Sequence, residues 1–372
     1  MRICIDIQAA IGQQAGVGRY ARSLAEAVAR HHGSHELGLF CFDFKRKGTG
    51  LDIEAAIQRS VRWCPGRIVQ KSWKTFGFPP FNWFAGNFDL YHFPNFVRPP
   101  LSSGKSVVTI HDVSFMRHPE TTESKNLRYL RSQIANTVAR SDAIITDSFF
   151  SKGEIEQLLG VESDRVFAVH LGLDSQRSTV DEDSKLAMRT RYGLERAYIL
   201  SVGTIEPRKN YPHLIDSFER LEGFDGDLVI AGMLGWKYEP ILERVKSSPQ
   251  AERIHVLDFV DERHLPSLYA DARLFAISSL YEGFGFTPLE AMQHGVPVLS
   301  SNGGSLSEVL GDAALIVEGF DADEWAAVMG ELIFDTGLRG SLAGKGRAQV
   351  ERFQWSKTAR ETLAVYEKVC GG

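Results

Sequence analysis

The alternation of short β-rich runs with helical patterns is the feature that most constrains what this chain can fold into. The runs that we interpret as strands in the first half are Arg2–Ile7, Leu37–Phe42, Leu90–Phe93, Val107–His111, Ala143–Thr146 and Val166–His170. Those in the second half are Tyr198–Val202, Asp227–Ala231, Ile254–Phe259, Leu274–Ile277, Pro297–Ser300 and Ala314–Val317. Helical patterns such as Val17–Arg30 and Lys125–Ala139 separate many of them. This order predicts an α/β protein with parallel sheets built from βαβ units.

A chain of 372 residues is too long for one ordinary hydrophobic core and long enough for two domains. The segment Asp174–Ser184 has one apolar residue in eleven, a composition typical of a linker. We therefore predict one Rossmann-like domain in residues 1–175 and a second in residues 176–355. The periodic run Ser356–Val369 follows the elements of the second sheet, and its apolar face needs a partner.

Composition narrows the class of protein and its partners. The net charge of −5 argues against nucleic acid. No apolar run approaches the roughly 20 residues needed to cross a bilayer, and the N-terminal run, which Asp6 interrupts, is predicted to be a strand rather than a signal peptide. We expect a cytoplasmic protein, at most peripheral on the cytoplasmic face of a membrane. Four cysteines without metal spacing or close pairs favour reduced thiols; they are Cys4, Cys41, Cys64 and Cys370.

The segment Ala55–Phe88 contains no Asp or Glu. Its basic residues alternate with aromatic ones, namely Arg59, Arg62, Arg67, Lys71 and Lys74 with Trp63, Trp73, Phe76, Phe78, Phe81, Trp83 and Phe84. This mixture is typical of a surface that contacts anionic lipid headgroups, and it favours peripheral membrane contact through residues 59–84. The alternative is a loop whose rings cover the core of the first domain.

Two carboxylates, Glu282 and Glu290, flank a glycine-rich turn that lies between a predicted strand and a helix start. A helix start presents backbone N–H groups and a positive dipole end to an anion, and carboxylates suit sugar hydroxyls. Glu282 follows the strand end directly, where side chains of parallel sheets meet a ligand. For Glu290 a structural alternative exists, because Thr287-Pro-Leu-Glu290 has the spacing of a capping box.

A second motif, Gly203-Thr-Ile-Glu-Pro-Arg-Lys-Asn210, follows another predicted strand and leads into a helix that Asn210 could cap. Arg208 offers bidentate geometry and Lys209 a point charge, so together they suit a diphosphate. The alternative is a solvated basic turn. Because the motif and the Glu282 turn both follow strands of one sheet, we expect them at the same edge.

In the first half, His111 is predicted to end a strand and is followed by Asp112, which makes it a candidate catalytic histidine. The alternative is a core histidine whose hydrogen bonds are satisfied within the protein. Gly16-Val-Gly18-Arg-Tyr20 opens a helix and mimics a dinucleotide fingerprint. About eight residues separate it from the preceding strand, whereas a true fingerprint turns at once, so a phosphate or acceptor loop is the better interpretation. The loop comprises Gly16, Val17, Gly18, Arg19 and Tyr20.

Metal ligation is a separate possibility, because many sugar transferases hold a divalent ion on an Asp-x-Asp pair. The three pairs of this chain, Asp181/Asp183, Asp225/Asp227 and Asp321/Asp323, lie in the linker, before a strand and at a helix start. None follows a strand, so we expect no metal. Two smaller features are Val260, where backbone groups near a strand end could meet a nucleobase, and Ser305-Leu-Ser-Glu308, which again has capping-box spacing.

Taken together, these motifs resemble the retaining glycosyltransferases of the GT4 type. Thr146-Asp-Ser-Phe-Phe-Ser-Lys152 and Leu171-Gly-Leu-Asp174 also match landmarks of that family. The resemblance implies a GT-B fold with two Rossmann-like domains whose parallel sheets face each other across a cleft. It further implies that the first domain binds the acceptor, that the second binds a nucleotide-sugar donor, and that the final helix, residues 356–370, crosses back to the first domain.

The resemblance also implies roles for individual residues. Arg208 and Lys209 would grip the donor diphosphate, and Glu290 would bind the ribose hydroxyls. Glu282 would contact the transferred sugar, and His111 would approach that sugar. The other donor-binding residues would be Gly203, Thr204, Val260, Gly283, Phe284, Gly285, Phe286 and Thr287.

The stretches His111–Pro119 and His92–Asn95 resemble bacterial mannosyltransferases of surface-polysaccharide and lipopolysaccharide assembly. GDP-mannose is therefore the expected donor, with another GDP- or UDP-hexose as the alternative, and the acceptor would be a saccharide or lipid-linked saccharide. We expect no cofactor. The chemistry would be a metal-independent front-face substitution with retention. The rivals are a NAD-dependent oxidoreductase, a GT-B epimerase or phosphorylase, and a sugar-nucleotide-binding protein without turnover.

Overall fold

The computed structural model describes residues 1–12, 16–46, 48, 50, 51, 53, 54, 56–174 and 180–371. Its contacts divide the chain into two compact units. The first unit comprises Met1–Val113, Arg128–Gly172 and Gln354–Gly372, and the second comprises Ser114–Leu127 and Leu173–Phe353. The predicted boundary between residues 175 and 176 and residues 175–179 of the predicted linker lie outside the described residues.

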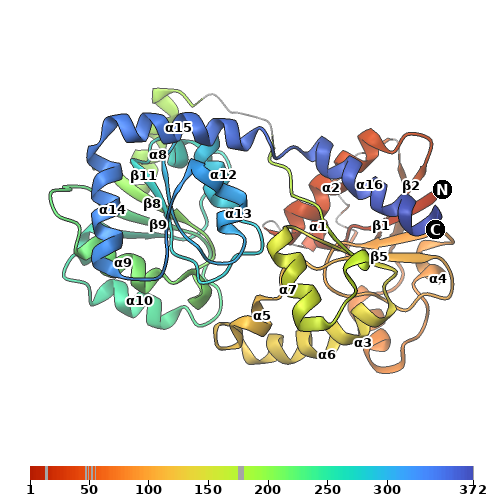
Figure 1. Cartoon of the computed structure of the whole chain (residues 1–372). Helices are drawn as coiled ribbons and strands as arrows, with labels where there is room; N and C mark the ends of the chain where they lie inside the picture. Colours follow the sequence, from red (N-terminus) through yellow and green to blue (C-terminus); the bar gives the residue numbers. More distant parts are fainter. Residues whose placement is uncertain are drawn as a thin grey trace. The chain divides into compact units, whose positions relative to one another are not determined.

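The first unit contains a parallel sheet that has seven strands among the described residues, in the order β3-β2-β1-β4-β5-β6-β7 (Figure 1). Its strands are β1 (Arg2–Asp6), β2 (Glu36–Phe42), β3 (Ala56–Val61), β4 (Leu90–Phe93), β5 (Lys105–Thr109), β6 (Ala143–Thr146) and β7 (Val166–Ala168). The helices of this part of the chain are α1 (Gln8–Gly12), α2 (Val17–His31), α3 (Gly66–Phe76), α4 (Asn82–Ala85), α6 (Ser124–Arg140), α7 (Phe149–Leu159) and α16 (Trp355–Gly371).

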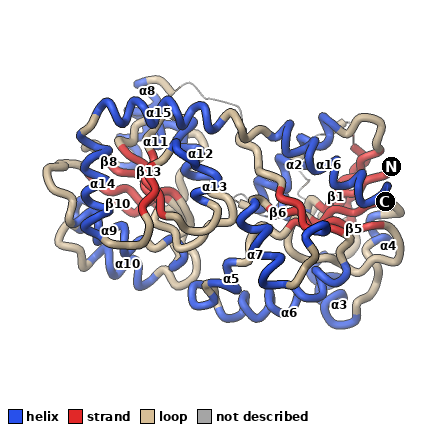
Figure 2. The backbone as a smooth tube through the Cα atoms, in the orientation of Figure 1, coloured by secondary structure: helices blue, strands red, loops and turns tan. Residues whose placement is uncertain are grey.

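The second unit contains a parallel sheet of six strands, counted over the residues that the structure describes, in the order β10-β9-β8-β11-β12-β13 (Figure 2). Its strands are β8 (Tyr198–Val202), β9 (Asp227–Ala231), β10 (Ile254–Leu257), β11 (Leu274–Ile277), β12 (Val298–Ser301) and β13 (Leu315–Val317). The α-helices assigned to it are α5 (Ser114–Arg117), α8 (Glu182–Tyr192), α9 (Tyr211–Glu219), α10 (Glu239–Lys246), α11 (Leu265–Ala270), α12 (Phe286–Gln293), α13 (Leu306–Leu310), α14 (Ala322–Phe334) and α15 (Thr336–Val350). The 3₁₀ turns of the chain are η1 (Pro119–Thr121), η2 (Ser163–Arg165), η3 (Pro207–Lys209), η4 (Ala251–Arg253) and η5 (Gly311–Ala313).

Both sheets have the strand order of doubly wound α/β folds, in which helices cover both faces and the strands are buried throughout. Residues of β4, β6, β9, β11 and β12 are buried along their full length. In the second unit α9 packs with α10 and α14, whereas α12 packs with α11 and α15. The core between α9, α14 and the sheet is largely aliphatic and includes the fully buried Trp325.

The final helix has the partner that its apolar face requires. Helix α16 packs against α2 of the first unit, and the two helices lie side by side in Figure 1. Its buried residues include Ala359, Leu363 and Tyr366. The expectation that this helix returns to the first domain is confirmed.

All predicted strands are present, with ends that differ from the prediction by no more than two residues. Strand β3 was not predicted. It lies at the edge of its sheet and its side chains are mostly exposed, so its sequence, Ala56–Val61, lacks the apolar pattern of the other strands. The predicted linker extends too far, because Asp181 accepts a hydrogen bond from Ser184 N and begins α8 at Glu182.

The acid-free segment forms β3, α3 and α4, and its first residue, Ala55, lies outside the described residues. Some of its rings do cover the core: Phe81 is 1% exposed, and Trp73 and Phe84 pack against Phe42. That interpretation is therefore correct for part of the segment. Other rings of the same segment are exposed. Among the described residues, no helix combines the length and the apolar character needed to span a bilayer.

Candidate functional site

Strand order places a candidate site in each sheet. In the first sheet β1 lies beside β4, and in the second sheet β8 lies beside β11. At each of these pairs the order of strands across the sheet reverses direction relative to their order along the chain. Loops that leave the carboxyl ends of two such strands diverge to opposite faces and form the crevice in which α/β proteins bind ligands. In the second unit these loops are residues 203–210, after β8, and residues 278–285, after β11.

The second unit brings the three predicted charged residues of these loops together. Arg208 Nη1 donates to Glu282 Oε2 at 2.9 Å, and Lys209 Nζ donates to Glu282 Oε1 at 2.6 Å. Ser279 Oγ also donates to Oε1, at 2.5 Å. The alternative of a solvated basic turn is wrong, because the side chains of Arg208 and Lys209 are only 19% and 13% exposed.

Sequence reasoning missed Glu206, which belongs to the same cluster. Arg208 Nη2 donates to Glu206 Oε1 at 2.7 Å, and Glu206 is 4% exposed. The guanidinium therefore lies between two carboxylates, and Nη1 also donates to the carbonyl of Tyr281. The signal available in the sequence was a glutamate two residues before Arg208, in the loop that follows the predicted strand Tyr198–Val202.

The cations keep Glu282 ionised. Burial alone raises the pKa of this carboxyl, but Arg208 and then Lys209 outweigh burial, and the pKa falls to about 2. Glu282 is therefore an acceptor of hydrogen bonds and not a proton donor at neutral pH. Among the hydrogen bonds of the described residues, Oε2 accepts one and Oε1 accepts two, which leaves acceptor capacity on Oε2.

Hydrogen bonds between three loops hold the cluster in place. Leu280 N donates to the carbonyl of Arg208, and Ser278 Oγ donates to the carbonyl of Lys209. The loop after β12 adds Ser305, whose N and Oγ both donate to the carbonyl of Glu282. Gly304 makes this approach possible, because it has a φ of +70° and a Cβ there would overlap the carbonyl of Glu282.

The capping-box interpretation of Glu290 is wrong. Helix α12 begins at Phe286 after Gly285, whose φ of +109° only glycine adopts readily, so Thr287 lies inside the helix and makes no cap bond. Glu290 instead accepts a hydrogen bond from the hydroxyl of Tyr269 at 2.8 Å. Its carboxylate is half-buried and anchored to α11, which leaves the predicted ribose role as a hypothesis.

The second capping box is wrong as well. Ser305 precedes α13 without a side-chain cap bond, because its hydroxyl donates to the carbonyls of Glu282 and Phe284. Asn210 precedes α9 in the left-handed region and makes no side-chain cap bond either. Neither side chain therefore makes the N-cap hydrogen bond that the sequence predicted.

The remaining predicted donor-binding residues occupy different environments. Gly203 accepts a hydrogen bond from Tyr211 Oη through its carbonyl, and Thr204 is exposed beside it. Gly283 is buried, and the Phe284 ring packs between Phe286 and Phe353. Only the backbone of Phe284 can therefore face a ligand. Val260 follows β10 by three residues and is 8% exposed, at the far side of the sheet from β11.

In the first unit, His111 lies just beyond β5 and is paired with a carboxylate that the sequence did not single out. His111 Nδ1 and Asp147 Oδ2 are 2.8 Å apart, and His111 Nε2 is 3.1 Å from the carbonyl oxygen of Pro94. Burial lowers the pKa of His111, but Asp147 outweighs burial and the pKa is raised. Since the Pro94 carbonyl can only accept, both ring nitrogens act as donors when Asp147 is ionised, and His111 is then an imidazolium.

The predicted phosphate or acceptor loop is the first turn of α2. Gly16 precedes the helix at φ +56°, and Val17 to Tyr20 form its start. Residues 13–15, which lead into this turn, lie outside the described residues. Tyr20 is 2% exposed, and its ring packs edge-on against His111 at 4.8 Å. Tyr20 can therefore act on a ligand only through His111.

A buried chain of polar groups connects Tyr20, whose ring packs against His111, to the final helix. The hydroxyl of Tyr20 is 2.9 Å from Thr109 Oγ1, which is 2.8 Å from His92 Nε2. His92 Nδ1 is 2.5 Å from the Tyr366 hydroxyl of α16. Burial lowers the pKa of His92 to about 3, so this ring is neutral. The sequence analysis named His92 only as part of a stretch that resembles mannosyltransferases. It did not predict that His92 links Thr109 to Tyr366.

The Asp-x-Asp pairs have local explanations where they are described. Asp321 accepts hydrogen bonds from Asp323 N and Glu324 N, and Asp181 accepts one from Ser184 N, so both are helix caps. Asp227 is buried at the start of β9. Over the described part of the chain, no group of three or more His, Cys, Asp or Glu side chains is arranged to hold a metal ion.

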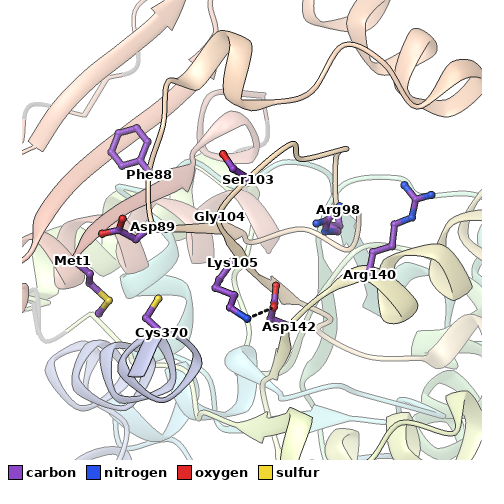
Figure 3. A pocket seen from close by; sticks show the side chains of 10 residues that line it. All are labelled: Met1, Phe88, Asp89, Arg98, Ser103, Gly104, Lys105, Arg140, Asp142 and Cys370. Carbon is purple, nitrogen blue, oxygen red and sulfur yellow. Dashed lines mark ion pairs between the residues drawn. The ribbon is translucent and has the colours of Figure 1, made fainter. Parts of the chain in front are cut away.

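An open pocket of about 930 Å³ lies at the other edge of the first sheet, near the amino ends of β4 and β5 (Figure 3). Arg98, Lys105 and Arg140 line it together with Asp89 and Asp142, and Lys105 Nζ lies 3.1 Å from Asp142 Oδ1. Because its cations are accompanied by acids and it lies away from the strand ends that carry His111 and Asp147, we do not assign it to the site.

Comparison with known proteins identifies the class. Residues 187–349 match the family described as glycosyl transferases group 1, and residues 15–177 match glycosyltransferase family 4. The chain is 33% identical to O-antigen chain mannosyltransferase B of Escherichia coli over 282 residues. The aligned region covers 75% of this chain and 74% of that protein.

Solved structures show the same fold. Sucrose-phosphate synthase of Thermosynechococcus elongatus superposes with a TM-score of 0.78 at 18% identity, over 99% of this chain and 98% of that one. HepE of Anabaena, in complex with UDP and glucose, gives a TM-score of 0.74 at 18% identity, over 99% and 100% of the two chains.

The fold and the family matches define a glycosyltransferase of the GT-B class. The chain belongs to the GT4-type family and is similar to bacterial O-antigen mannosyltransferases.

Proposed function

We propose that this glycosyltransferase moves mannose from GDP-mannose to a saccharide or lipid-linked saccharide during surface-polysaccharide synthesis. The observation that carries the proposal is the cluster of Arg208, Lys209 and Glu282 where β8 and β11 diverge. Two cations at that position suit a diphosphate. The E. coli relative is described as an O-antigen chain mannosyltransferase, and this supports both the sugar and the setting.

In the proposed reaction, the bond between the anomeric carbon and the diphosphate oxygen breaks, and the nucleoside diphosphate leaves. The acceptor oxygen bonds to the anomeric carbon on the same face, so the configuration is retained, and the acceptor proton passes to an oxygen of the leaving diphosphate. Negative charge grows on that diphosphate as the bond breaks. Arg208, Lys209 and the positive end of α12 would stabilise this charge.

The two carboxylates have distinct proposed tasks. Glu282 is ionised and already orients both cations, and its Oε2 retains capacity to accept a hydrogen bond from a hydroxyl of the transferred sugar. Glu290, anchored by Tyr269, would accept hydrogen bonds from the ribose hydroxyls. His111 would contact the sugar as an imidazolium held by Asp147.

The proposed reaction needs no metal, because Arg208 and Lys209 supply the positive charge that a divalent ion supplies in other transferases. Other GDP- or UDP-sugars remain the alternative donors. The oxidoreductase, the epimerase or phosphorylase and the non-catalytic binding protein gain no support from the family matches.

A thermal-shift panel of GDP, UDP, ADP, GDP-mannose, UDP-glucose and NAD tests the donor. A ligand at about 100 times its Kd stabilises the folded state by about 2.7 kcal/mol. We expect GDP and GDP-mannose to give the largest shifts, and Lys209→Gln to reduce them. The matched control is Arg220→Gln, which removes a half-exposed arginine paired with Asp323 in the same unit.

A larger shift with UDP would overturn the guanine assignment, and a shift with NAD alone would overturn the enzyme class. With GDP-mannose and a mannose oligosaccharide, NMR of the product should show the α-anomer. Activity that is lost with chelator and restored by manganese would contradict the metal-free proposal.

A further inference from the structure

The acid-free segment exposes an unusual number of large rings. Trp63 is 74% exposed, Phe76 78%, Phe78 51% and Trp83 66%. Folded chains seldom leave several tryptophan and phenylalanine side chains exposed so close in sequence, and contiguous apolar surface marks an interaction site. Since Trp73, Phe81 and Phe84 already cover the core beneath, these four rings are available for another contact.

Three of these exposed rings, Trp63, Phe78 and Trp83, are connected through neighbouring residues of the same segment. The rings of Phe78 and Trp83 lie 5.0 Å apart, and Trp63 stacks on Phe84 at 5.9 Å. Trp73 joins the two pairs, because its ring lies 6.3 Å from Phe84 and its Nε1 donates to the carbonyl of Pro79. We name the surface formed by Trp63, Phe76, Phe78, Trp83, Arg67 and Lys71 the aromatic-basic face.

Positive charge surrounds these rings. Arg67 and Lys71 lie one turn apart on the exposed side of α3. Lys74 Nζ lies 5.0 Å above the ring of Tyr129, which brings α3 beside α6 (Figure 1). On α6, Arg128 and Arg131 are exposed. Neither residues 56–88 nor residues 124–140 contain an Asp or Glu. The two helices therefore add positive charge without local compensation.

We propose that the aromatic-basic face docks the protein on an anionic lipid bilayer. Tryptophan and phenylalanine rings favour the headgroup boundary, and lysine and arginine side chains are attracted to an anionic leaflet. Charge complementarity selects this occupant over a second copy of the chain, because a symmetric dimer through this face would place like charges opposite each other. All residues of the face belong to the first unit, and none is among the proposed donor-binding or catalytic residues.

Flotation of the full chain with vesicles tests the proposal. We expect it to float with mixed phosphatidylglycerol–phosphatidylcholine vesicles, to float far less with phosphatidylcholine alone, and to be released by high salt. Trp63→Ser/Trp83→Ser and, separately, Arg67→Glu/Lys71→Glu should each reduce the bound fraction about tenfold or more. The fluorescence of the exposed tryptophans should shift to the blue on binding.

The matched controls are Phe334→Ser, 56% exposed, and Arg191→Glu/Lys246→Glu, two exposed basic residues of the second unit. They should float like the unchanged chain. Both face variants should keep the thermal shift with GDP, so a failure of membrane docking is distinguishable from a failure of the proposed function.

Three outcomes would overturn the proposal. The first is that the unchanged chain stays in the unbound fraction with anionic vesicles, and the second is that the face variants and the controls lose binding equally. A dimer in analytical ultracentrifugation that Trp63→Ser/Trp83→Ser dissolves, without vesicle binding by the unchanged chain, would assign the face to a second copy.

Discussion

The same strand order carries different chemistry in the two units. At the β8/β11 crevice, Arg208 and Lys209 meet Glu282 and Glu206 in a fully ionic cluster. In the first unit, on the strands next to the β1/β4 reversal, the chemistry is a histidine paired with one aspartate and packed against the Tyr20 ring. Topology thus determines where a site forms, and the residues that follow each strand determine which charge the site can stabilise.

The largest expected effect removes the guanidinium of the ionic cluster. Arg208→Ala should lower kcat/KM about 1000-fold, or about 4 kcal/mol, because charge on the leaving diphosphate loses a preorganised partner. It also leaves the carboxylate of Glu206, 4% exposed, without its guanidinium. Steady-state kinetics and thermal melting measure the two effects.

Arg208→Ala/Glu206→Gln separates chemistry from stability. It removes the unpaired negative charge of Glu206, so the melting temperature should return towards that of the unchanged chain while kcat/KM stays low. If kcat/KM recovered together with the melting temperature, Arg208 would be a structural residue. The ionic cluster of the second unit would then not have the catalytic role that distinguishes it from the histidine site of the first unit.

The second prediction concerns the acid stability that the ionic cluster supplies. The pKa of Glu282 falls from an ordinary 4.5 to about 2, which corresponds to about 3 kcal/mol. Because the folded-state pKa is the lower one, this stabilisation is complete above pH 4.5 and is lost as the pH falls towards 2. Urea unfolding should show the unchanged chain losing about 2 kcal/mol more than Glu282→Gln between pH 5 and pH 3. Equal losses would refute the assignment.

The third prediction concerns the histidine of the first unit. His111→Ala should lower kcat about 100-fold, because it removes the imidazolium that would contact the transferred sugar. Burial lowers the pKa of His111, whereas Asp147, by its charge and its hydrogen bond, and to a lesser extent Asp112 raise it. Asp147→Asn should therefore move the alkaline limb of the kcat–pH profile to lower pH, with the limb retained. An unchanged profile would show that the charge of His111 does not contribute.

Much of the fold could be predicted because buried parallel strands have distinctive sequences. Runs such as Leu274–Ile277 carry only residues that burial allows, and their boundaries match the structure. The edge strand β3, with exposed side chains, has no such signature. The meeting of Arg208 with Glu282 was predictable for a related reason, since both follow strands of one sheet.

What could not be predicted depends on contacts between distant residues. Capping boxes at Thr287 and Ser305 are plausible from spacing alone, yet Tyr269 binds Glu290 and the carbonyl of Glu282 binds Ser305. Likewise Asp147 lies 36 residues from His111 in sequence, and no local pattern connects the two. Local spacing describes only the bonds that a segment can make with itself.

The cluster around Arg208 also bears on selectivity. Because Glu206 and Glu282 form ion pairs with Arg208 and Lys209, the four side chains together carry no net charge. A small ion such as inorganic phosphate would have to compete with the resident glutamates and would gain little. Under the proposed function, a donor that adds contacts through its base, ribose and sugar would offset the cost of breaking these ion pairs, so Glu206 and Glu282 would favour a complete donor over free phosphate.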